Sequence, residues 1–449
     1  MNPTVSVSLT PSITLHHTQT ERFKTARLSL FAVMPADRED SPLTTLLFGI
    51  LRRGSEGYPS LAQLNRRLDE LYGTTLTIRN YLHGDSHVVS YTAEMLEARF
   101  LPPHHGDMDL LCGVTRLLAD MILRPLRDPD GGLRTDAVEK EKQSLVDSLR
   151  SLRNDTRAYA ATRLREIMCD GEPYGISIGG TVEQVEAITP RDVTARYEAM
   201  MKELRLEIFY TGRASLGEVE SAWEQAFGDF CPVRAEKTVK TDKTVNSLHP
   251  VPSTPRFAEE DMAVSQGKLC LSWACGQNFS TVGDPRTLAA YAVCNELFGV
   301  MQNSLLFRYV REELGLCYYC DSALDMTKGI LWVSCGIHPD RKEEAEAAIC
   351  GQRTALREGE ITSEDVELAK LSLLNSYRQM EDSQNSMEAF AFGKLMNGTA
   401  ETPEEEMAYI SAVTVSDVVA VARTFAPDTV FFLRGTQADG EGEEEGYDD

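Results

Sequence analysis

The chain contains an internal repeat, and this feature constrains its fold more than any other. The stretch AITPRDVTARYEAM, which begins at Ala187, resembles AVTVSDVVAVARTF, which begins at Ala412. Both stretches predict a capped turn followed by a helix. Each is followed by a short apolar strand that ends in glycine, LEIFYTG at Gly212 and TVFFLRG at Gly435. The repeat therefore predicts two halves with the same fold.

The order of elements is also the same in both halves. A pair of strands is followed by two helices, a hairpin, three helices and a last strand. Strands grouped with strands, with helices burying one face, predict an α+β fold: two homologous domains, each an antiparallel sheet with helices packed on one face. The predicted bounds are residues 1–234 for the first domain, 235–260 for a polar linker, 261–437 for the second domain and 438–449 for an acidic tail.

The charge of the chain excludes some classes of partner. Its 449 residues carry a formal net charge of −24. A phosphate backbone or an anionic membrane surface would repel such a chain, so we expect neither nucleic acid nor membrane among its partners. The first residues, MNPTVSVSLT, lack a basic region followed by an apolar run, and no stretch approaches the length of a membrane span. We therefore expect a cytoplasmic protein.

The ten cysteines predict buried, reduced thiols rather than a disulfide scaffold, because most of them lie inside apolar runs of a large chain. Cys317 and Cys320 have the spacing of a redox motif, in CYYC. Their aromatic neighbours and strand-like context favour packing, and the sequence offers no second pair of cysteines to complete a zinc site. We expect no metal ion at these residues.

The histidines do not form a metal-binding pattern either. They include two adjacent pairs and one pair spaced by four residues: His16–His17, His104–His105, and His83 with His87. Adjacent side chains point in different directions on a strand, and the stretch HGDSH is typical of a hairpin turn rather than a helix. We therefore expect solvated loop histidines and not metal ligands.

Three longer stretches carry a resemblance to a known family. They are RRGSEGYPSLAQLNRRLDELYG from Arg52, GEPYGISIGGTVEQVEAIT from Gly171 and LLFRYVREELGLCYY from Leu305. Together they resemble the M16 (pitrilysin/insulinase-like) metallopeptidases, most closely the short M16B type. The resemblance covers nearly the whole chain. It implies two homologous α+β domains in each subunit and two subunits that enclose a peptide chamber.

The same resemblance implies a zinc site that this chain has lost. Active members carry H-x-x-E-H in the helix that matches PLTTLLFGILRRG here, with two histidine ligands, a glutamate base and a further glutamate ligand downstream. The matching positions are Thr45, Phe48 and Gly49. Counted from Glu141 as the preceding acid, the downstream position is Ser148. The chain contains no H-x-x-E-H, so the resemblance implies no cofactor in this chain and a zinc ion only in a partner subunit.

A second part of the family's active site is retained. Active members use an arginine and a tyrosine spaced R-x6-Y, and Arg311 and Tyr318 have this spacing in REELGLCY. The residues alone favour a simpler interpretation, in which the arginine complements a helix dipole and the tyrosine belongs to the core. The resemblance implies that both side chains face the chamber, across a break at Gly315, and donate hydrogen bonds to a peptide carbonyl. Tyr319, on the opposite strand face, is expected to pack.

Two functions follow from the resemblance. In the first, the chain is the non-catalytic subunit of a heterodimeric M16B zinc peptidase, inactive alone, that donates Arg311 and Tyr318 to a composite site for peptide hydrolysis with an H-x-x-E-H-bearing partner. Zinc-less members of this kind occur in a paired bacterial system associated with elongation factor P modification, which implies the same link here. In the second, the chain is an inactive pseudo-peptidase that binds peptides or acts as a scaffold. A peptidase with relocated zinc ligands is a third alternative.

Overall fold

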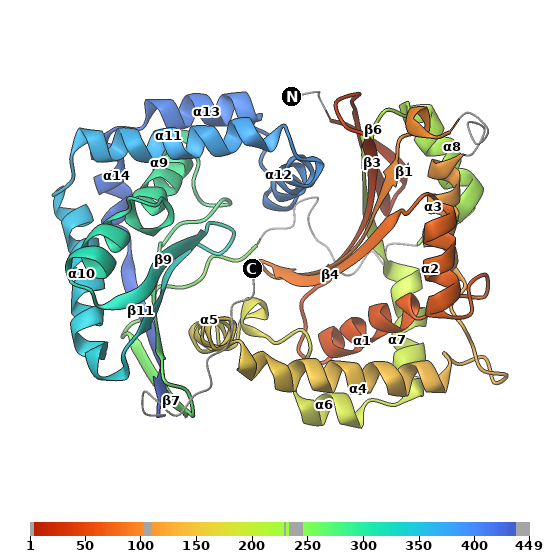
Figure 1. Ribbon diagram of the computed structural model, residues 1–449, viewed down its shortest axis with the longest axis horizontal. Helices are drawn as coiled ribbons and strands as arrows, with labels where there is room; N and C mark the ends of the chain where they lie inside the picture. The colour runs from red at the N-terminus through yellow and green to blue at the C-terminus, as the bar shows by residue number, and fades with distance from the viewer. Residues whose placement is uncertain (1–3, 103–108, 229, 233–245, 437–449) are drawn as a thin grey trace. The chain divides into compact units, whose positions relative to one another are not determined.

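The structure is a computed structural model that describes residues 4–102, 109–228, 230–232 and 246–436 (Figure 1). The chain divides into two compact units, each with its own sheet. Unit 1 comprises Met1–Ser151, Ile176–Asp242 and Gln384–Phe392, and unit 2 comprises Leu152–Gly175, Lys243–Ser383 and Gly393–Asp449. Two segments therefore pack with the other half of the sequence, Leu152–Gly175 in unit 2 and Gln384–Phe392 in unit 1. The predicted bounds 1–234 and 261–437 did not include this exchange.

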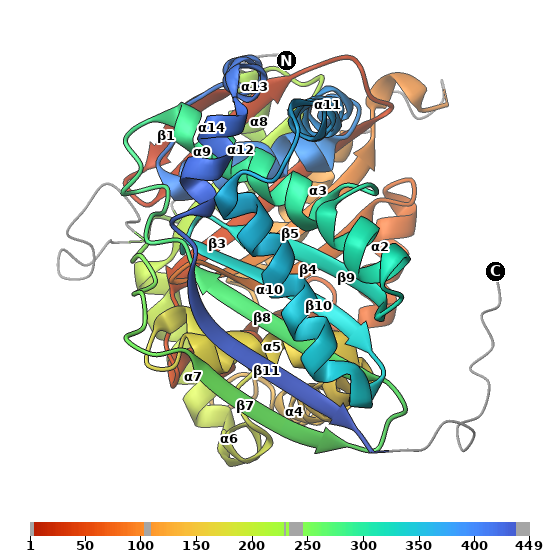
Figure 2. The same ribbon diagram turned by 90° about the vertical axis from the view of Figure 1, so that its left-hand side faces the viewer.

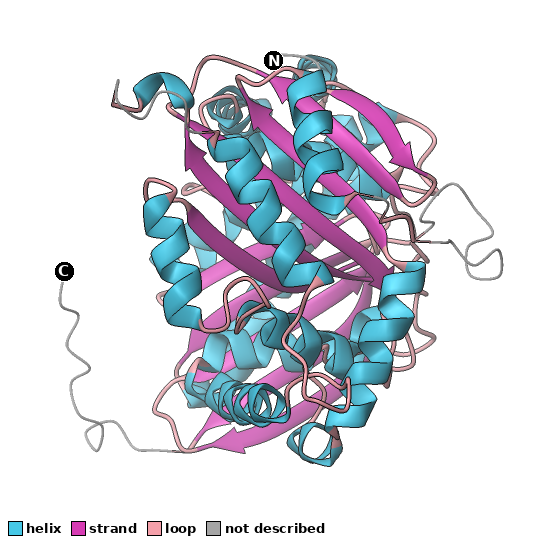
Figure 3. Cartoon of the chain, turned by 90° about the vertical axis from the view of Figure 1, so that its right-hand side faces the viewer, coloured by secondary structure: helices cyan, strands magenta, loops and turns pink. Residues whose placement is uncertain are grey.

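Six strands form the sheet of unit 1, in the order β1-β2-β6-β3-β5-β4, drawn in magenta in Figure 3. Their bounds are β1 Val5–Thr10, β2 Ile13–Gln19, β3 Thr25–Pro35, β4 Thr75–His83, β5 Ser86–Leu96 and β6 Arg205–Gly212. All neighbours are antiparallel except β2 and β6, which run parallel. Parallel neighbours need a long crossover connection, and most of the unit lies between these two strands in sequence.

Helices cover one face of this sheet and bury its alternating apolar side chains. The helices of unit 1 are α1 Asp40–Arg52, α2 Leu61–Glu70, η1 Ala98–Phe100, α3 Leu110–Leu123, α4 Thr135–Ser151, α6 Val182–Ala187, α7 Pro190–Glu203 and α8 Leu216–Phe227. Leu28 and Leu30 of β3 are buried in the same core as Leu46 and Leu47 of α1. The alternation in β3 follows from the period of two in a strand.

The other face of the unit 1 sheet is also covered in part. Phe31, which lies between the helix-facing residues of β3, stacks on Phe392 with ring centroids 4.3 Å apart. Phe392 belongs to α12 (Gln384–Asn397), whose first part packs in unit 1. Gln384 donates a hydrogen bond to the carbonyl oxygen of Thr25, at a distance of 2.8 Å. A helix from the second half of the sequence thus completes the packing of the first sheet.

Unit 2 repeats the arrangement with five strands, in the order β7-β11-β8-β10-β9, which Figure 2 shows side by side with α10 crossing them. The strands are β7 Arg256–Met262, β8 Gly267–Ala274, β9 Cys317–Asp325, β10 Ile330–Ile337 and β11 Ala426–Gly435. The helices are η3 Leu152–Asn154, α5 Thr156–Met168, η4 Pro173–Gly175, α9 Pro285–Asn295, η5 Glu296–Val300, η6 Leu306–Glu313, η7 Pro339–Arg341, α10 Lys342–Glu358, α11 Ser363–Met380, α13 Pro403–Ala412 and α14 Val415–Ala422. Again one pair, β7 and β11, is parallel.

Helix α5 covers the second face of the unit 2 sheet. Its side chains Tyr159 and Leu164 are buried against Cys270 of β8 and against Phe431 and Leu433 of β11. The α+β class predicted from the sequence is confirmed. Two details of that prediction were wrong: each sheet contains one parallel pair, and helices lie on both faces because a segment of the other half of the chain packs there.

The repeat seen in the sequence corresponds to equivalent elements. Helix α7 begins with a capping box between Thr189 and Asp192, and α14 begins with one between Thr414 and Asp417. The strands β6 and β11 follow these helices and end at the glycines that close the repeated stretches. The predicted capped helix and terminal strand are therefore present in both units.

The predicted linker and tail fall largely outside the described residues. Residues 235–245 and 438–449 are among those that the structure does not describe. The end of the predicted linker, 256–260, is part of β7 instead, because this segment pairs with β11 from Arg256 onwards. In the ranges that the structure describes, no helix is long and apolar enough to cross a membrane.

Candidate functional site

The position predicted for the glutamate base is part of the hydrophobic core of unit 1. Phe48 on α1 is 3% exposed. Its ring lies 5.7 Å from the ring of Tyr91 on β5, and the Tyr91 hydroxyl donates a hydrogen bond of 2.9 Å to the carbonyl oxygen of Phe48. Burial raises the pKa of Tyr91. The side chain at this position therefore packs and has no access to a substrate.

The hydroxyl of Thr45, at the first histidine position, is already used as donor and acceptor. It donates to the carbonyl oxygen of Ile178 at 2.7 Å and accepts from the side-chain amide of Asn80 at 2.8 Å. The amide oxygen of Asn80 in turn contacts Nε2 of His87. Burial, with a smaller effect of Arg196, lowers the pKa of His87 to about 4, so this histidine is neutral at physiological pH.

The second histidine position is filled by a carboxylate from α4. A Cβ atom added to Gly49 would lie 2.3 Å from Oε1 of Glu141. The other carboxylate oxygen of Glu141 accepts a hydrogen bond of 2.6 Å from Nε of Arg53. Ser148, predicted at the downstream ligand position, is exposed near the end of α4. The α4 residue that contacts this part of α1 is Glu141, and Ser148 lies two helical turns further along α4.

These residues do not fit a zinc ion. Structural and catalytic zinc sites use nitrogen, sulfur or carboxylate ligands, with three or four of them on one ion. Thr45 is committed to two hydrogen bonds, Phe48 and Gly49 offer no ligand atom, and Glu141 is paired with Arg53. At the positions that the sequence resemblance matched to a zinc site, the structure thus shows packing and hydrogen bonding.

Arg311 and Tyr318 belong to two consecutive elements of unit 2. Arg311 is in the last turn of the π-helix η6, and its guanidinium lies 4.9 Å from the centroid of the Phe307 ring and 3.5 Å from a carboxylate oxygen of Glu312. Tyr318 is the second residue of β9. Between them Gly315 has φ of 57°, a left-handed conformation that glycine adopts without steric cost. This is the break that the sequence predicted.

Both side chains are accessible within unit 2. The side chain of Arg311 is 43% exposed, and Tyr318 is 67% exposed. No residue in the part of the chain that the structure describes forms a hydrogen bond with the Tyr318 hydroxyl. Tyr319 is different: it is half-buried, with the guanidinium of Arg157 4.3 Å from its ring centroid, so the prediction that it packs is confirmed. Tyr318 therefore presents an exposed hydroxyl without a partner among the described residues, whereas the ring of Tyr319 packs under Arg157.

The sequence predicted that the histidines are solvated loop residues. For the described histidines of unit 1 this prediction is wrong. His16 and His17 are buried on β2 because this strand lies between β1 and β6. Nε2 of His16 is 2.9 Å from a carboxylate oxygen of Glu207, and Nε2 of His17 is 2.8 Å from the carbonyl oxygen of Ala214. His87 is buried as well, and His104 and His105 lie outside the described residues.

Unit 2 contains a buried polar cluster that the sequence did not reveal. His249 lies with Nδ1 2.5 Å from a carboxylate oxygen of Glu172 and Nε2 2.8 Å from one of Asp428. Nζ of the fully buried Lys328 is 3.0 Å from the second oxygen of Glu172. Burial alone would lower the pKa of His249, but the hydrogen bonds of Asp428, Cys169 and Glu172 outweigh it and raise the pKa to about 11. The cluster joins segments far apart in sequence, so no local motif could have predicted it.

All ten cysteines are free, as predicted, and six of them are buried. The sequence did not indicate that Cys335 lies beside the CYYC motif. The sulfur atoms of Cys317, Cys320 and Cys335 all lie within 4.8 Å of one another. The signal that could have found this contact is the antiparallel register of β9 and β10, which places Cys320 opposite Cys335.

Comparisons with known proteins agree with the fold and with the lost zinc motif. The chain is 27% identical to a protein of Bacillus subtilis named "Probable inactive metalloprotease YmfF", over 95% of this chain and 96% of that protein. An uncharacterized zinc protease of Mycobacterium tuberculosis is 24% identical over 68% of this chain and 67% of its own length. Residues 187–373 match the family profile described as "Peptidase M16 inactive domain".

Solved structures give the same result. A conserved protein from Enterococcus faecalis superimposes with a TM-score of 0.85 at 27% identity, covering 96% of this chain and 98% of that one. A peptidase M16 inactive domain from Pseudomonas fluorescens has a TM-score of 0.75 at 16% identity, over 97% of this chain and 99% of that one, which supports the fold alone. Over nearly its whole length the chain is therefore similar to proteins of the M16 peptidase family, and its sequence contains no H-x-x-E-H.

Proposed function

We propose that this chain is the non-catalytic subunit of a heterodimeric M16 peptidase. The partner subunit carries H-x-x-E-H and brings the zinc ion and the general base, which the residues at Thr45, Phe48 and Gly49 cannot replace. This chain contributes Arg311 and Tyr318 to a composite site for peptides. The likeness to YmfF, a relative named as a probable inactive metalloprotease, supports the first part of the proposal.

The observation that carries the second part is the free, exposed donor at Tyr318. A tyrosine that is 67% exposed contributes little burial to folding, and its hydroxyl has no partner among the described residues. Arg311, seven residues earlier, keeps its charge accessible: its side chain is 43% exposed, and the carboxylate at 3.5 Å is that of the exposed Glu312. Such an exposed pair is worth little as an ion pair, so the guanidinium is available for a ligand.

The chemistry of these two groups suits a peptide carbonyl. A phenol and a guanidinium both donate hydrogen bonds, and the guanidinium adds a positive charge. Donors of this kind stabilise the negative charge that develops on a carbonyl oxygen during hydrolysis. Removal of one such donor lowers kcat by about 10²- to 10³-fold in well-studied hydrolases. We expect losses of this size from Arg311→Ala and from Tyr318→Phe.

The test is co-expression of this chain with the product of a neighbouring reading frame of similar length that carries H-x-x-E-H. Each chain alone and the pair are assayed for zinc content and for cleavage of unstructured peptides. We expect zinc in the partner, peptide cleavage by the pair and no cleavage by this chain alone. Arg311→Ala and Tyr318→Phe should leave the complex intact by size-exclusion chromatography while turnover falls by the factor above.

Matched controls separate a direct role from a general loss of structure. Tyr309→Phe removes the hydroxyl of another exposed tyrosine on η6, and Arg66→Ala removes a highly exposed guanidinium on α2. Both controls should keep full turnover. Unchanged turnover in Arg311→Ala or Tyr318→Phe would contradict the composite site. A chain that binds peptides as a homodimer, with no zinc-bearing partner, would instead support a pseudo-peptidase that serves as a scaffold.

The narrower link to elongation factor P modification stays a prediction from the sequence resemblance. Its test is deletion of the gene for this chain, followed by intact-mass analysis of elongation factor P. An unchanged distribution of modified forms would contradict the link. The result does not affect the proposed subunit role, which is measured on the purified pair.

A further inference from the structure

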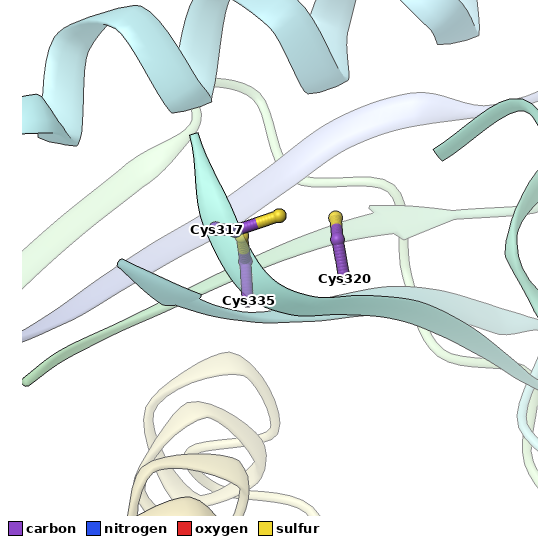
Figure 4. A group of neighbouring side chains, drawn as sticks. All are labelled: Cys317, Cys320 and Cys335. Atoms are coloured by element: carbon purple, nitrogen blue, oxygen red, sulfur yellow. The ribbon is translucent and has the colours of Figure 1, made fainter. Parts of the chain in front are cut away.

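Three thiols gather on one face of the β9–β10 hairpin in unit 2 (Figure 4). Cys320 on β9 lies directly opposite Cys335 on β10 in the antiparallel register. Directly opposed residues project from the same face of a sheet, so these two sulfur atoms are neighbours. Cys317 adds a third sulfur, and all three lie within 4.8 Å of one another.

A β-bulge brings Cys317 to this face. In a regular strand, Cys317 and Cys320 would point to opposite faces, because they are three residues apart. The register, however, passes from the pair Tyr319–Gly336 directly to the pair Cys317–Ile337. At this point β9 therefore contains one more residue than β10. The extra residue shifts the alternation of the β9 side chains between the two faces of the sheet, so Cys317 lies on the same face as Cys320. The same bulge leaves Tyr318 exposed between its neighbours.

A second group of potential metal ligands in unit 2 consists of Cys169, Glu172 and His249. The environment of the three thiols differs from that of this group. Cys320 and Cys335 are buried in the apolar core, and Cys317 is half-buried and gives access from solvent. The donor atoms of His249 and Glu172 are already tied to Asp428 and Lys328. Within the described ranges, the hydrogen-bonding contacts of the three thiols are with one another and not with charged groups.

We propose that Cys317, Cys320 and Cys335 bind one soft, thiol-seeking metal cation, of which Zn²⁺ and Cu⁺ are the biological examples. Sulfur ligands lie about 2.3 Å from zinc, so three of them around one ion are about 4 Å apart, which small side-chain rotations from the observed spacing reach. Each sulfur forms a bond to the ion as its thiol proton passes to solvent, and no oxidant or reductant is needed. The fourth position of a tetrahedral ion stays open for water or another ligand.

The evidence for this site does not rest on the proposed peptidase role, although the site adjoins Tyr318. An ion bound to Cys317 and Cys320 would span the bulge from both sides of Tyr318. Metal ligation of two strands across a bulge reduces the conformational freedom of the residues between the ligands. The position of Tyr318 would then depend on metal binding in unit 2 and not on zinc in a partner.

The experiment is metal titration of the full-length chain, purified under reducing conditions and freed of metal. Co²⁺ serves as a spectroscopic probe for the zinc arm, read as a sulfur-to-cobalt charge-transfer band that Zn²⁺ then displaces. A second arm titrates Cu⁺ against a chromogenic chelator. We expect one ion per chain in at least one arm, and the arm with the tighter binding identifies the metal.

Cysteine variants assign the site. Cys317→Ser, Cys320→Ser and Cys335→Ser should each weaken binding by more than the about 10- to 100-fold that loss of an outer-sphere partner costs. Cys350→Ser, at a half-buried thiol on α10, is the matched control and should bind as the unmodified chain does. Because Cys335 is fully buried, circular dichroism checks the fold, and Cys317→Ser, at the half-buried position, gives the decisive result if the buried variants unfold.

Three results would overturn the proposal. One is the absence of stoichiometric binding in both arms. Another is equal affinity of Cys317→Ser and the unmodified chain. The third is a disulfide between two of the three cysteines in the freshly reduced and desalted protein, found as linked peptides whose mass is lower by two hydrogen atoms than the sum of the reduced peptides.

Discussion

The replacement Phe48→Glu introduces the residue that the sequence resemblance predicts for the general base of active M16 peptidases, and we expect it to destabilise unit 1 instead of activating the chain. Phe48 is 3% exposed and packs against Tyr91. A carboxylate there would be placed among apolar side chains. The neighbouring hydroxyl of Tyr91 is no ready partner, because it already donates to the carbonyl oxygen of Phe48.

The magnitude follows from two terms. Loss of a buried phenylalanine costs about 3–5 kcal/mol in comparable cores. A buried polar group without a hydrogen-bonding partner costs about 1–3 kcal/mol more. The sum of about 4–8 kcal/mol approaches the total stability of a typical domain, about 5–15 kcal/mol. Unit 1 should therefore be unfolded or marginal in Phe48→Glu, whereas the control Phe48→Leu, which keeps an apolar side chain, should cost about 1–1.5 kcal/mol.

The assay must report on each unit separately. Trp223 is in unit 1, while Trp273 and Trp332 are in unit 2, so total fluorescence would mix the two transitions. Hydrogen exchange with mass spectrometry along a urea series resolves them by peptide. We expect peptides of α1 and β5 to lose protection at lower urea in Phe48→Glu, with β8 and β10 of unit 2 less affected. A change in unfolding free energy of unit 1 below about 1 kcal/mol would refute the reasoning.

Three further predictions test other parts of the structure. The pKa of His249 is raised from 6.5 in an unfolded chain to about 11, so its protonated form stabilises unit 2. This contribution is fully present below pH 6.5 and is lost as the pH rises towards 11. Between pH 7 and 10 the melting temperature should therefore fall more steeply for the unmodified chain than for His249→Gln. His87 has the opposite effect on the pH dependence, because its pKa is lowered to about 4. As the pH drops from 6.5 to 4 the unfolded chain takes up the proton before the folded chain does, so the stability of unit 1 falls. His87→Gln should make this fall smaller. Leu164→Ala on α5 should cost unit 2 about 2–5 kcal/mol, seen as lost exchange protection in β11 and not in the sheet of unit 1; the reverse pattern would contradict the exchange of segments.

The features that the sequence predicted correctly depend on neighbouring residues and occur in both halves of the chain. The capped helices α7 and α14 and the glycines at the ends of β6 and β11 follow from turn and cap chemistry within a few residues. The parallel pairing of β2 with β6 was missed, because nothing in either strand encodes which partner a distant strand will find. The burial of His16 was missed for the same reason. Its strand, β2, has a polar sequence but lies between β1 and β6 in the sheet.

The candidate site shows the same limit. The spacing of Arg311 and Tyr318 was readable because one turn joins their elements, and the structure leaves both exposed. The placement of Ser148 relied on a count along α4 and stays a prediction, whereas the contact of Glu141 with Gly49 became visible only in the fold. Cys335 could not be linked to Cys317 from spacing, because their proximity depends on a strand register and a bulge. Contacts that depend on strand register can be identified only once the three-dimensional fold is known.

The two halves of the candidate site place opposite demands on stability, and this difference supports the proposed division of roles. A histidine or glutamate held at a buried zinc position costs free energy once the ion is absent, because a polar group is then buried without its partner. Phe48 and the bonded hydroxyl of Thr45 remove that cost from unit 1. Tyr318 is exposed, so folding gains little from its side chain and would lose little if it were replaced. Packing thus accounts for the residues of α1, whereas it gives no reason for the exposed phenol of Tyr318, which the proposed role as a hydrogen-bond donor to a peptide would explain.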